Sequence, residues 1–122
     1  MKYAALLTSN ADDVAAWEKL SPEEAAAARA EEIPKWEALF GELGQAGTLG
    51  AGFELDSPST AKTVRVRGGE TLVTDGPFAE TKEQIGGLME LDAEDLDAAI
   101  AIAARIPVAS RASVELRPVI EH

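Results

Sequence analysis

The chain has no cysteine and only one histidine, His122, its final residue. Without cysteine it can have no disulfide, no thiolate nucleophile and no cysteine-based metal site. A histidine at a chain end is poorly held for general-base catalysis, so Ser-His and Cys-His nucleophile pairs are not expected. No metal-ligand spacing stands out among the carboxylates. We therefore expect neither a metal nor an organic cofactor.

Positive charge and long hydrophobic runs are also scarce. The 122 residues include 11 Lys and Arg against 22 Asp and Glu, a formal net charge of −11. Such an acidic field repels phosphate backbones and anionic membranes, so neither nucleic acid nor membrane is an expected partner. The opening MKYAALLTSN has five apolar residues between Lys2 and Thr8, too few for a signal-peptide core. We expect one soluble, cytoplasmic domain over residues 1–122.

The first third of the chain predicts one strand followed by helices. Residues 1–8 form an apolar run that is typical of a buried strand. Residues 10–20 favour a short helix, for which Asn10 is placed to act as the N-cap. Ser21 and Glu24 then have the spacing of a capping box, with a proline between them at the first helical position.

The helix that Ser21 opens is rich in alanine and glutamate, which favour helix but offer little to a core. Pro34 is expected to kink or break it near Ile33. Beyond that point the apolar residues repeat at helical spacing and predict a packing face, before Gly44 and Gly47 end the helix. These residues are Ile33, Trp36, Leu39, Phe40 and Leu43.

Residues 48–55 predict a second strand, and residues 63–75 predict a β-hairpin. Its two alternating runs flank Gly68-Gly69, the composition of a two-residue primed turn. With these glycines as the loop, four cross-strand pairs follow by counting outward. They are Arg67 with Glu70, Val66 with Thr71, Val64 with Val73, and Lys62 with Asp75.

The last third predicts a strand at 85–91, a helix at 93–106 and a strand at 113–119. Asp92 is expected to cap the helix and Pro107 to stop it. Without the hairpin, the order of elements is βαββαβ, the split-βαβ or ferredoxin-like α+β pattern.

Helices cover only one face of such a sheet. Leu6, Leu88 and Val119 are candidates to line the other face, which would be a large exposed patch on a monomer. We therefore expect a homodimer that stacks two sheets face to face, as a dimeric α/β barrel.

The segments VRVRGGETLVTDGPFAETKEQIGG, DLDAAIAIAARIP and SVELRPV resemble the DGPF-domain proteins, a branch of the YCII-related family. The resemblance runs over nearly the whole chain. It implies a ferredoxin-like domain that dimerises through its sheet face. The wider family is considered enzyme-like because a His and an Asp share a cleft, whereas DGPF members are often encoded beside extracytoplasmic-function sigma factors. This chain departs from the pattern at Thr8-Ser9 and at Leu88-Met89, where relatives commonly carry aromatic residues or histidine.

Asp75 is the best candidate for chemistry, because it ends a strand beside a turn that would fix its direction. Burial would raise the pKa of this carboxyl and make it a usable acid or base. An equally physical alternative is a turn residue whose carboxylate accepts hydrogen bonds from turn amides. The other candidates for a ligand site are Gly76, Pro77, Phe78, Lys82, Arg65, Arg117 and Glu115. Lys82 has the alternative of balancing its acidic neighbours.

Three functions stay open at this point, and whether the protein is an enzyme stays open with them. The first is a dimeric domain that binds a small molecule in a cleft near the DGPF loop, residues 75–78. The second is an accessory module that binds a protein partner, such as a sigma factor. The third is a cofactor-independent oxygenase, which rests on analogy of fold alone.

Overall fold

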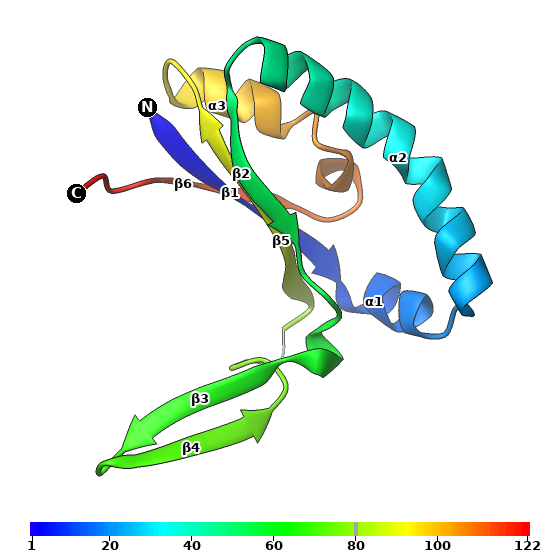
Figure 1. Ribbon diagram of the computed structural model, residues 1–122, viewed down its shortest axis with the longest axis vertical. Coiled ribbons are helices and arrows are strands. Elements are labelled where there is room, and N and C mark those ends of the chain that lie inside the picture. Colours follow the sequence, from blue (N-terminus) through cyan, green and yellow to red (C-terminus); the bar gives the residue numbers. More distant parts are fainter. Residues whose placement is uncertain (80) are drawn as a thin grey trace.

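The computed structural model describes residues 1–79 and 81–122 (Figure 1). In chain order the helices and strands are β1 (Lys2–Asn10), α1 (Ala11–Glu18), α2 (Pro22–Gln45), β2 (Leu49–Glu54), a 3-10 turn (Pro58–Thr60), β3 (Lys62–Arg67), β4 (Glu70–Asp75), β5 (Glu83–Asp92), α3 (Leu96–Ala103), a second 3-10 turn (Pro107–Ser110) and β6 (Val114–Pro118).

Four of the strands form one antiparallel sheet in the order β2-β5-β1-β6. β5 lies between β1 and β2, the two strands that α1 and α2 connect, as in a split βαβ motif. The expected α+β class is confirmed. Within the described residues the sheet stays open, with β2 and β6 as edge strands, and does not close into a barrel.

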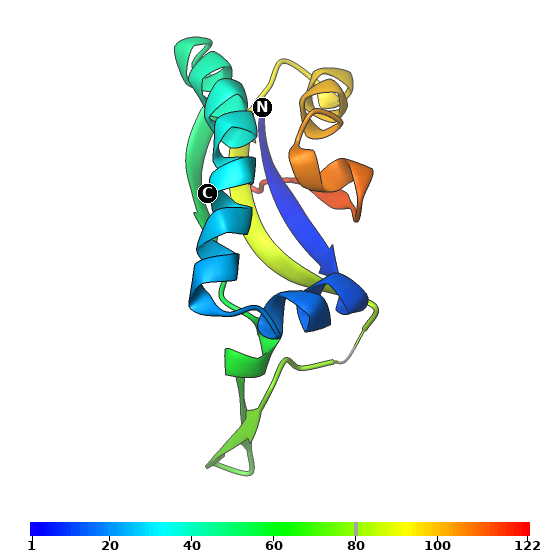
Figure 2. The ribbon, with the colours of Figure 1, turned by 90° about the vertical axis from the view of Figure 1, so that its right-hand side faces the viewer.

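The core lies between this sheet and the helices on one of its faces (Figure 2). From Tyr3 to Leu7 every second residue of β1 is buried, in line with the two-residue period of a strand. These side chains meet the buried Leu39 and Leu43 of α2 and Ala99 of α3. The remaining fully or nearly buried apolar residues are Tyr3, Ala5, Leu7, Met89, Leu91, Ala93, Ala103 and Ile106.

The capping predictions for the first two helices are confirmed. The Asn10 side chain accepts a hydrogen bond from the Asp13 amide, 2.8 Å away. Ser21 and Glu24 form both halves of a capping box, and this hydrogen bonding holds the pKa of Glu24 below its ordinary value. Each contact satisfies an amide that the first helical turn leaves without a partner.

The predicted break at Pro34 is wrong, because α2 continues through this residue as one helix of 24 residues. Proline removes a single helical hydrogen bond. The alanine- and glutamate-rich turns before it favour helix strongly, and the apolar stripe after it is fixed in the core. These neighbours outweigh the local cost.

The expected limits of α3 are also wrong. Asp95, not Asp92, is its N-cap, and its carboxylate accepts a hydrogen bond from the Ala98 amide at 2.8 Å. The helix ends at Ala103, so Pro107 does not stop it but begins the second 3-10 turn. Asp92 is the last residue of β5 instead.

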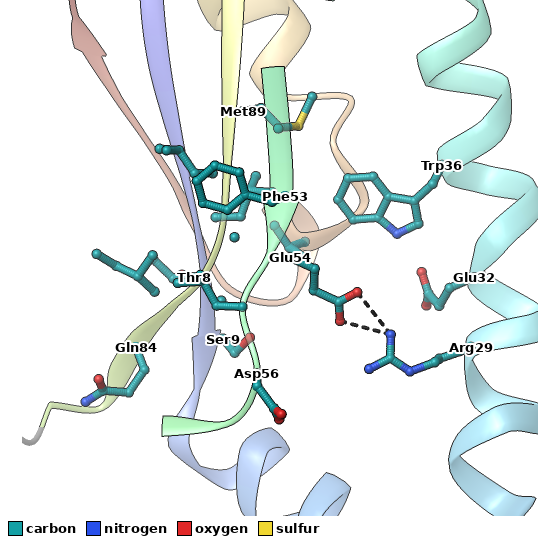
Figure 3. A pocket seen from close by; sticks show the side chains of 18 of the residues that line it. Thr8, Ser9, Arg29, Glu32, Trp36, Phe53, Glu54, Asp56, Gln84 and Met89 are labelled. Carbon is teal, nitrogen blue, oxygen red and sulfur yellow. Dashed lines mark hydrogen bonds and ion pairs between the residues drawn. The ribbon is translucent and has the colours of Figure 1, made fainter. Parts of the chain in front are cut away.

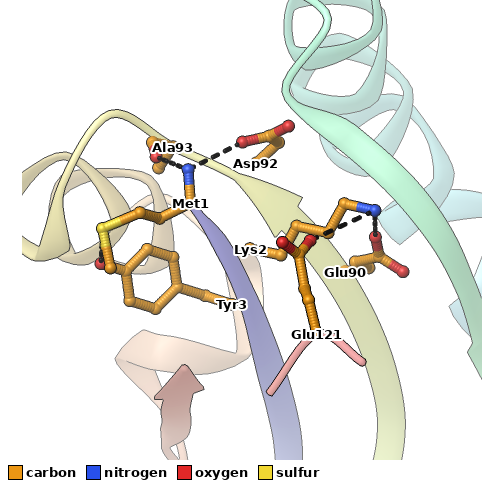
Figure 4. A network of polar contacts seen from close by, with 7 residues as sticks. All are labelled: Met1, Lys2, Tyr3, Glu90, Asp92, Ala93 and Glu121. Atoms are coloured by element: carbon orange, nitrogen blue, oxygen red, sulfur yellow. Dashed lines mark hydrogen bonds and ion pairs between the residues drawn. The ribbon is translucent and has the colours of Figure 1, made fainter. Parts of the chain in front are cut away.

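Asp92 takes part in a polar network where β1 begins beside the end of β5 (Figure 4). Its carboxylate lies 3.2 Å from the N-terminal ammonium of Met1, which also donates to the Ala93 carbonyl at 2.9 Å. The neighbouring Lys2 ammonium lies 3.5 Å from Glu90 and 3.7 Å from Glu121, and the charges of these two glutamates raise the pKa of Lys2.

The hairpin prediction is confirmed in full, including its register. All four expected pairs are present, and Gly68 and Gly69 have φ angles of 56° and 80°, as a primed turn requires. The hairpin forms its own two-stranded sheet and projects away from the body of the protein (Figure 1).

Candidate functional site

Asp75 lies at the base of this hairpin, in contact with solvent rather than in a pocket. Its side chain is 87% exposed and pairs with the Lys62 ammonium. Gly76 follows with a φ of 89°, and its amide donates to the Ala61 carbonyl at 2.8 Å. Thr63 donates its hydroxyl to the Gly76 carbonyl at 2.8 Å. The turn is therefore anchored by its backbone, and the Asp75 carboxylate is not among its anchors.

The other predicted site residues are spread over three places. Phe78 is 80% exposed and Lys82 is also exposed, in the segment that returns to the main sheet. Arg65 lies in β3 opposite Leu72. Glu115 and Arg117 pair with each other at 2.6 Å on the sheet face opposite the helices. The fold thus does not gather these residues into one site.

A cleft of about 770 Å³ lies elsewhere, between the sheet, α1 and the middle of α2 (Figure 3). Leu39 and Leu43 fix the second half of α2 in the core. The first half carries mainly small or charged side chains, so it stands away from β1, β2 and β5 and leaves the space open. This volume is within the range of about 300–1,000 Å³ that is usual for small-molecule sites.

The inner wall of the cleft is apolar. Trp36 points into it from α2 and Met89 faces it from β5 (Figure 3). Phe40 lines it one turn further along, and its ring centre lies 5.5 Å from that of Trp36 in a tilted contact. Leu7, Leu49 and Val108 complete this wall, which could bury an aromatic or aliphatic body of a ligand.

An ion pair spans the mouth of the cleft. One guanidinium nitrogen of Arg29, on α2, lies 3.0 Å from both carboxylate oxygens of Glu54, at the end of β2. The Arg29 guanidinium also lies over the Trp17 ring, 5.0 Å from its centre. Both side chains of the ion pair are more than half exposed, so the pair is screened by solvent and can open at little cost.

Glu32 lies one turn beyond Arg29 and points into the cleft (Figure 3). One of its oxygens lies 3.5 Å from Arg111 and 4.0 Å from Lys35. The other oxygen, Oε2, is shielded from solvent and has no hydrogen-bond partner among the described residues. A shielded carboxylate oxygen without a donor is unfavourable, so the Glu32 carboxylate is only partly satisfied by its protein partners.

The floor of the cleft contains a β-bulge with paired glycines. Leu7 pairs with Gly87 and Thr8 with Ile85, so Gly86 is the extra residue in β5. A side chain at Gly87 would place its Cβ 3.2 Å from the Phe53 carbonyl oxygen, and at Gly86 3.0 Å from the Ser9 hydroxyl. The glycines allow three strands to approach each other beneath the cleft.

Sequence reasoning missed this cleft, although two signals were available. The alanine-rich turns of α2 indicated a stretch with little to pack, and such a stretch leaves space beneath it. The helical spacing of Trp36 and Phe40 predicts core residues rather than the lining of a ligand site. Trp36 packs against the core and remains partly exposed, whereas Phe40 is 37% exposed and contacts the Trp36 ring.

Within residues 1–79 and 81–122, no three His, Cys, Asp or Glu side chains are grouped closely enough to hold a metal ion. No helix in the same ranges combines the length and apolar character needed to cross a bilayer.

The model of the YCII-related domain family matches residues 1–122 of the chain. The chain belongs to the YCII-related family. It is also similar to an uncharacterised protein of Rhizobium meliloti (strain 1021), with 36% identity over 120 residues, 97% of this chain and 91% of that protein. The family expected from the sequence is confirmed, while assignment to its DGPF branch remains a prediction.

Proposed function

We propose that this YCII-related protein binds a small organic molecule in the cleft between α2 and the sheet. The observation that supports this function is the combination of an open space of about 770 Å³, an apolar inner wall and a polar mouth. A purely structural cavity of this size would leave apolar side chains without packing partners, which is unfavourable. Whether bound molecules are also transformed stays open.

Intrinsic fluorescence provides a direct test, because the chain has only two tryptophans and both line the cleft. A library of small metabolites is titrated while tryptophan emission is recorded. Binding in the cleft should change the emission of Trp36 and Trp17, and the single variants Trp36→Phe and Trp17→Phe assign the signal. A library in which no compound changes the emission or raises the melting temperature would contradict the proposal.

The protein acts as a homodimer with a ferredoxin-like fold in this proposal. Cross-strand partners share a face, so Leu6, Leu88 and Phe53 lie together on the face away from the helices. Phe53 is 59% exposed there. A second sheet stacked on this face would form the dimeric α/β barrel and cover these side chains.

The hairpin is a further contact for the second copy. Val64, Val66 and Val73 lie on one of its faces and are 60%, 61% and 59% exposed. A two-stranded hairpin with such a face is marginally stable alone in water. Residues 62–75 carry three positive and two negative charges, a net of +1, which leaves −12 for the rest of the chain. A second copy therefore offers an acidic surface to a basic and apolar arm.

The same exposed valines favour one alternative, a module that binds a different protein, such as a sigma factor. The two functions predict different masses. A dimer gives twice the chain mass for the purified protein alone, whereas the alternative gives a monomer whose hairpin contacts only the added partner. Light scattering of the purified protein at micromolar concentration separates them.

A further inference from the structure

We propose that the ligand of the cleft is an organic cation, an aromatic or aliphatic body that carries an ammonium group with at least one N–H. This inference rests on the proposed function, because it specifies which chemical class the cleft takes. It is carried by the charges at the mouth, by the Glu32 carboxylate and by the aromatic side chains beside it.

The charge of the lining is negative even after its arginines are counted. Arg29 and Arg111 are its two positive groups, and both are already engaged, with Glu54 and Glu32 respectively. Five carboxylates line the same space, so the net charge is −3. They are Asp13, Glu32, Glu37, Glu54 and Asp56. A carboxylate or phosphate ligand would meet this field and find no free cation among the described lining residues, whereas an ammonium ligand is attracted by it.

Glu32 supplies a defined position for the ammonium group. Its side chain is 34% exposed and points into the cleft, and its Oε2 atom lacks a donor among the described residues and meets a ligand when the carboxylate turns toward the open space (Figure 3). Hydrogen bonds from an N–H of an ammonium group to a carboxylate are short and strong. A quaternary ammonium has the charge but no N–H, so it would leave this oxygen without a partner. We therefore expect a protonated amine to bind more tightly than its trimethylated form.

Aromatic rings stand beside this position. Arg29 already places its guanidinium over Trp17, which shows that a cation is accommodated next to this ring. Trp36 lies on the same helix one turn beyond Glu32 and points into the space (Figure 3). An amine held by Glu32 would therefore have its apolar body against Trp36, Phe40 and the inner wall.

Four probes with one common body separate charge from apolar contact. They are phenylbutylamine, its trimethylated form, phenylbutanol and phenylbutyrate, and the alkylamine is protonated at pH 7, as lysine is. Each is titrated into the full-length protein at low salt while tryptophan emission is excited outside the absorption of the phenyl ring. Amide resonances of α2 and β5, recorded in parallel, locate the bound probe.

We expect phenylbutylamine to bind about tenfold or more tightly than phenylbutanol, since a hydrogen bond to a charged group has this effect. Phenylbutyrate should bind more weakly than the alcohol. Glu32→Gln should reduce the affinity for the amine by about tenfold and change that for the alcohol little. Glu31→Gln is the matched control, because the neighbouring Glu31 is exposed on α2 and does not line the cleft.

Several results would overturn the inference, and they differ from a failure of the proposed function. If phenylbutanol binds in the cleft and phenylbutyrate equals or exceeds phenylbutylamine, the cleft stands and the cation is wrong. An equal effect of Glu32→Gln and Glu31→Gln on amine affinity would show only a general charge effect, and would remove Glu32 from the site. If no probe, charged or neutral, shifts the resonances around Trp36, both the ligand class and the binding function fail.

Discussion

Replacing the three exposed valines of the hairpin by threonine tests whether this arm contacts a second copy of the chain. Threonine keeps the β-branched shape and the strand preference of valine, so the triple variant Val64→Thr, Val66→Thr, Val73→Thr should keep the hairpin itself. The three side chains are 60%, 61% and 59% exposed in the single chain, so most of their surface is still available for burial.

The magnitude follows from that available surface. Full burial of a valine side chain is worth at least about 1.5 kcal/mol, and about 60% of it remains, which gives about 1 kcal/mol for each residue. Threonine loses most of this gain because its hydroxyl must give up water. Three residues on each of two symmetric hairpins then weaken the dimer by about 6 kcal/mol, or about four orders of magnitude in the dissociation constant.

Sedimentation equilibrium over a range of concentrations measures this constant for wild type and variant. Ile100→Thr is the control, because Ile100 is 50% exposed on α3, away from both the hairpin and the open sheet face. A triple variant that dimerises as tightly as wild type would show that the hairpins lie outside the interface. A wild type that is monomeric at micromolar concentration would refute the dimer itself.

Three further predictions concern single positions. Gly87→Ala should lower the free energy of unfolding by about 1–3 kcal/mol, because the added methyl meets a fixed carbonyl of β2. Gly86→Ala should change it by less than about 0.5 kcal/mol, because its methyl meets a hydroxyl that can rotate away; urea unfolding measures both. Hydrogen bonding to Arg105 lowers the pKa of Glu42. The stability advantage of wild type over Glu42→Gln should therefore be complete above the ordinary glutamate pKa of 4.5 and disappear as pH falls through the lowered pKa. An advantage that increased at acidic pH would contradict this. Asp75→Asn should change the free energy of unfolding by less than about 0.5 kcal/mol and leave the affinity for phenylbutylamine unchanged, because the exposed Asp75 side chain lies outside the cleft lining. Loss of binding would restore Asp75 as a site residue.

The hairpin shows where local sequence was sufficient to predict structure. Gly68 and Gly69 have positive φ angles that other residues adopt at a cost, so their position sets the turn, and the turn sets every pair to Lys62 and Asp75. The same holds for the caps at Asn10 and Ser21, where one side chain meets one amide close in sequence. Short-range geometry of this kind depends little on the rest of the fold.

Pro34 and Asp92 show where local rules were overruled by tertiary contacts. Proline is a strong local signal, yet the turns on both sides of Pro34 remain helical because the second half of α2 is fixed in the core. Asp92 has the chemistry of an N-cap, but its position at the end of β5 places it beside the Met1 ammonium. Asp95 then takes the capping role three residues later. Neither outcome follows from the residues nearby in sequence.

The cleft could not be predicted for a related reason, since it depends on where α2 is attached. Leu39 and Leu43 pack in the core, and Arg105 pairs with Glu42 beside them, so the second half of the helix is fixed to the sheet. The first half has no buried residue and meets β2 through the exposed pair of Arg29 and Glu54. If the proposed function holds, an attachment at one end with an exposed ion pair at the other would allow α2 to admit a ligand without disturbing the core. The same alanine-rich turns that contribute little to the core therefore leave room for the cleft.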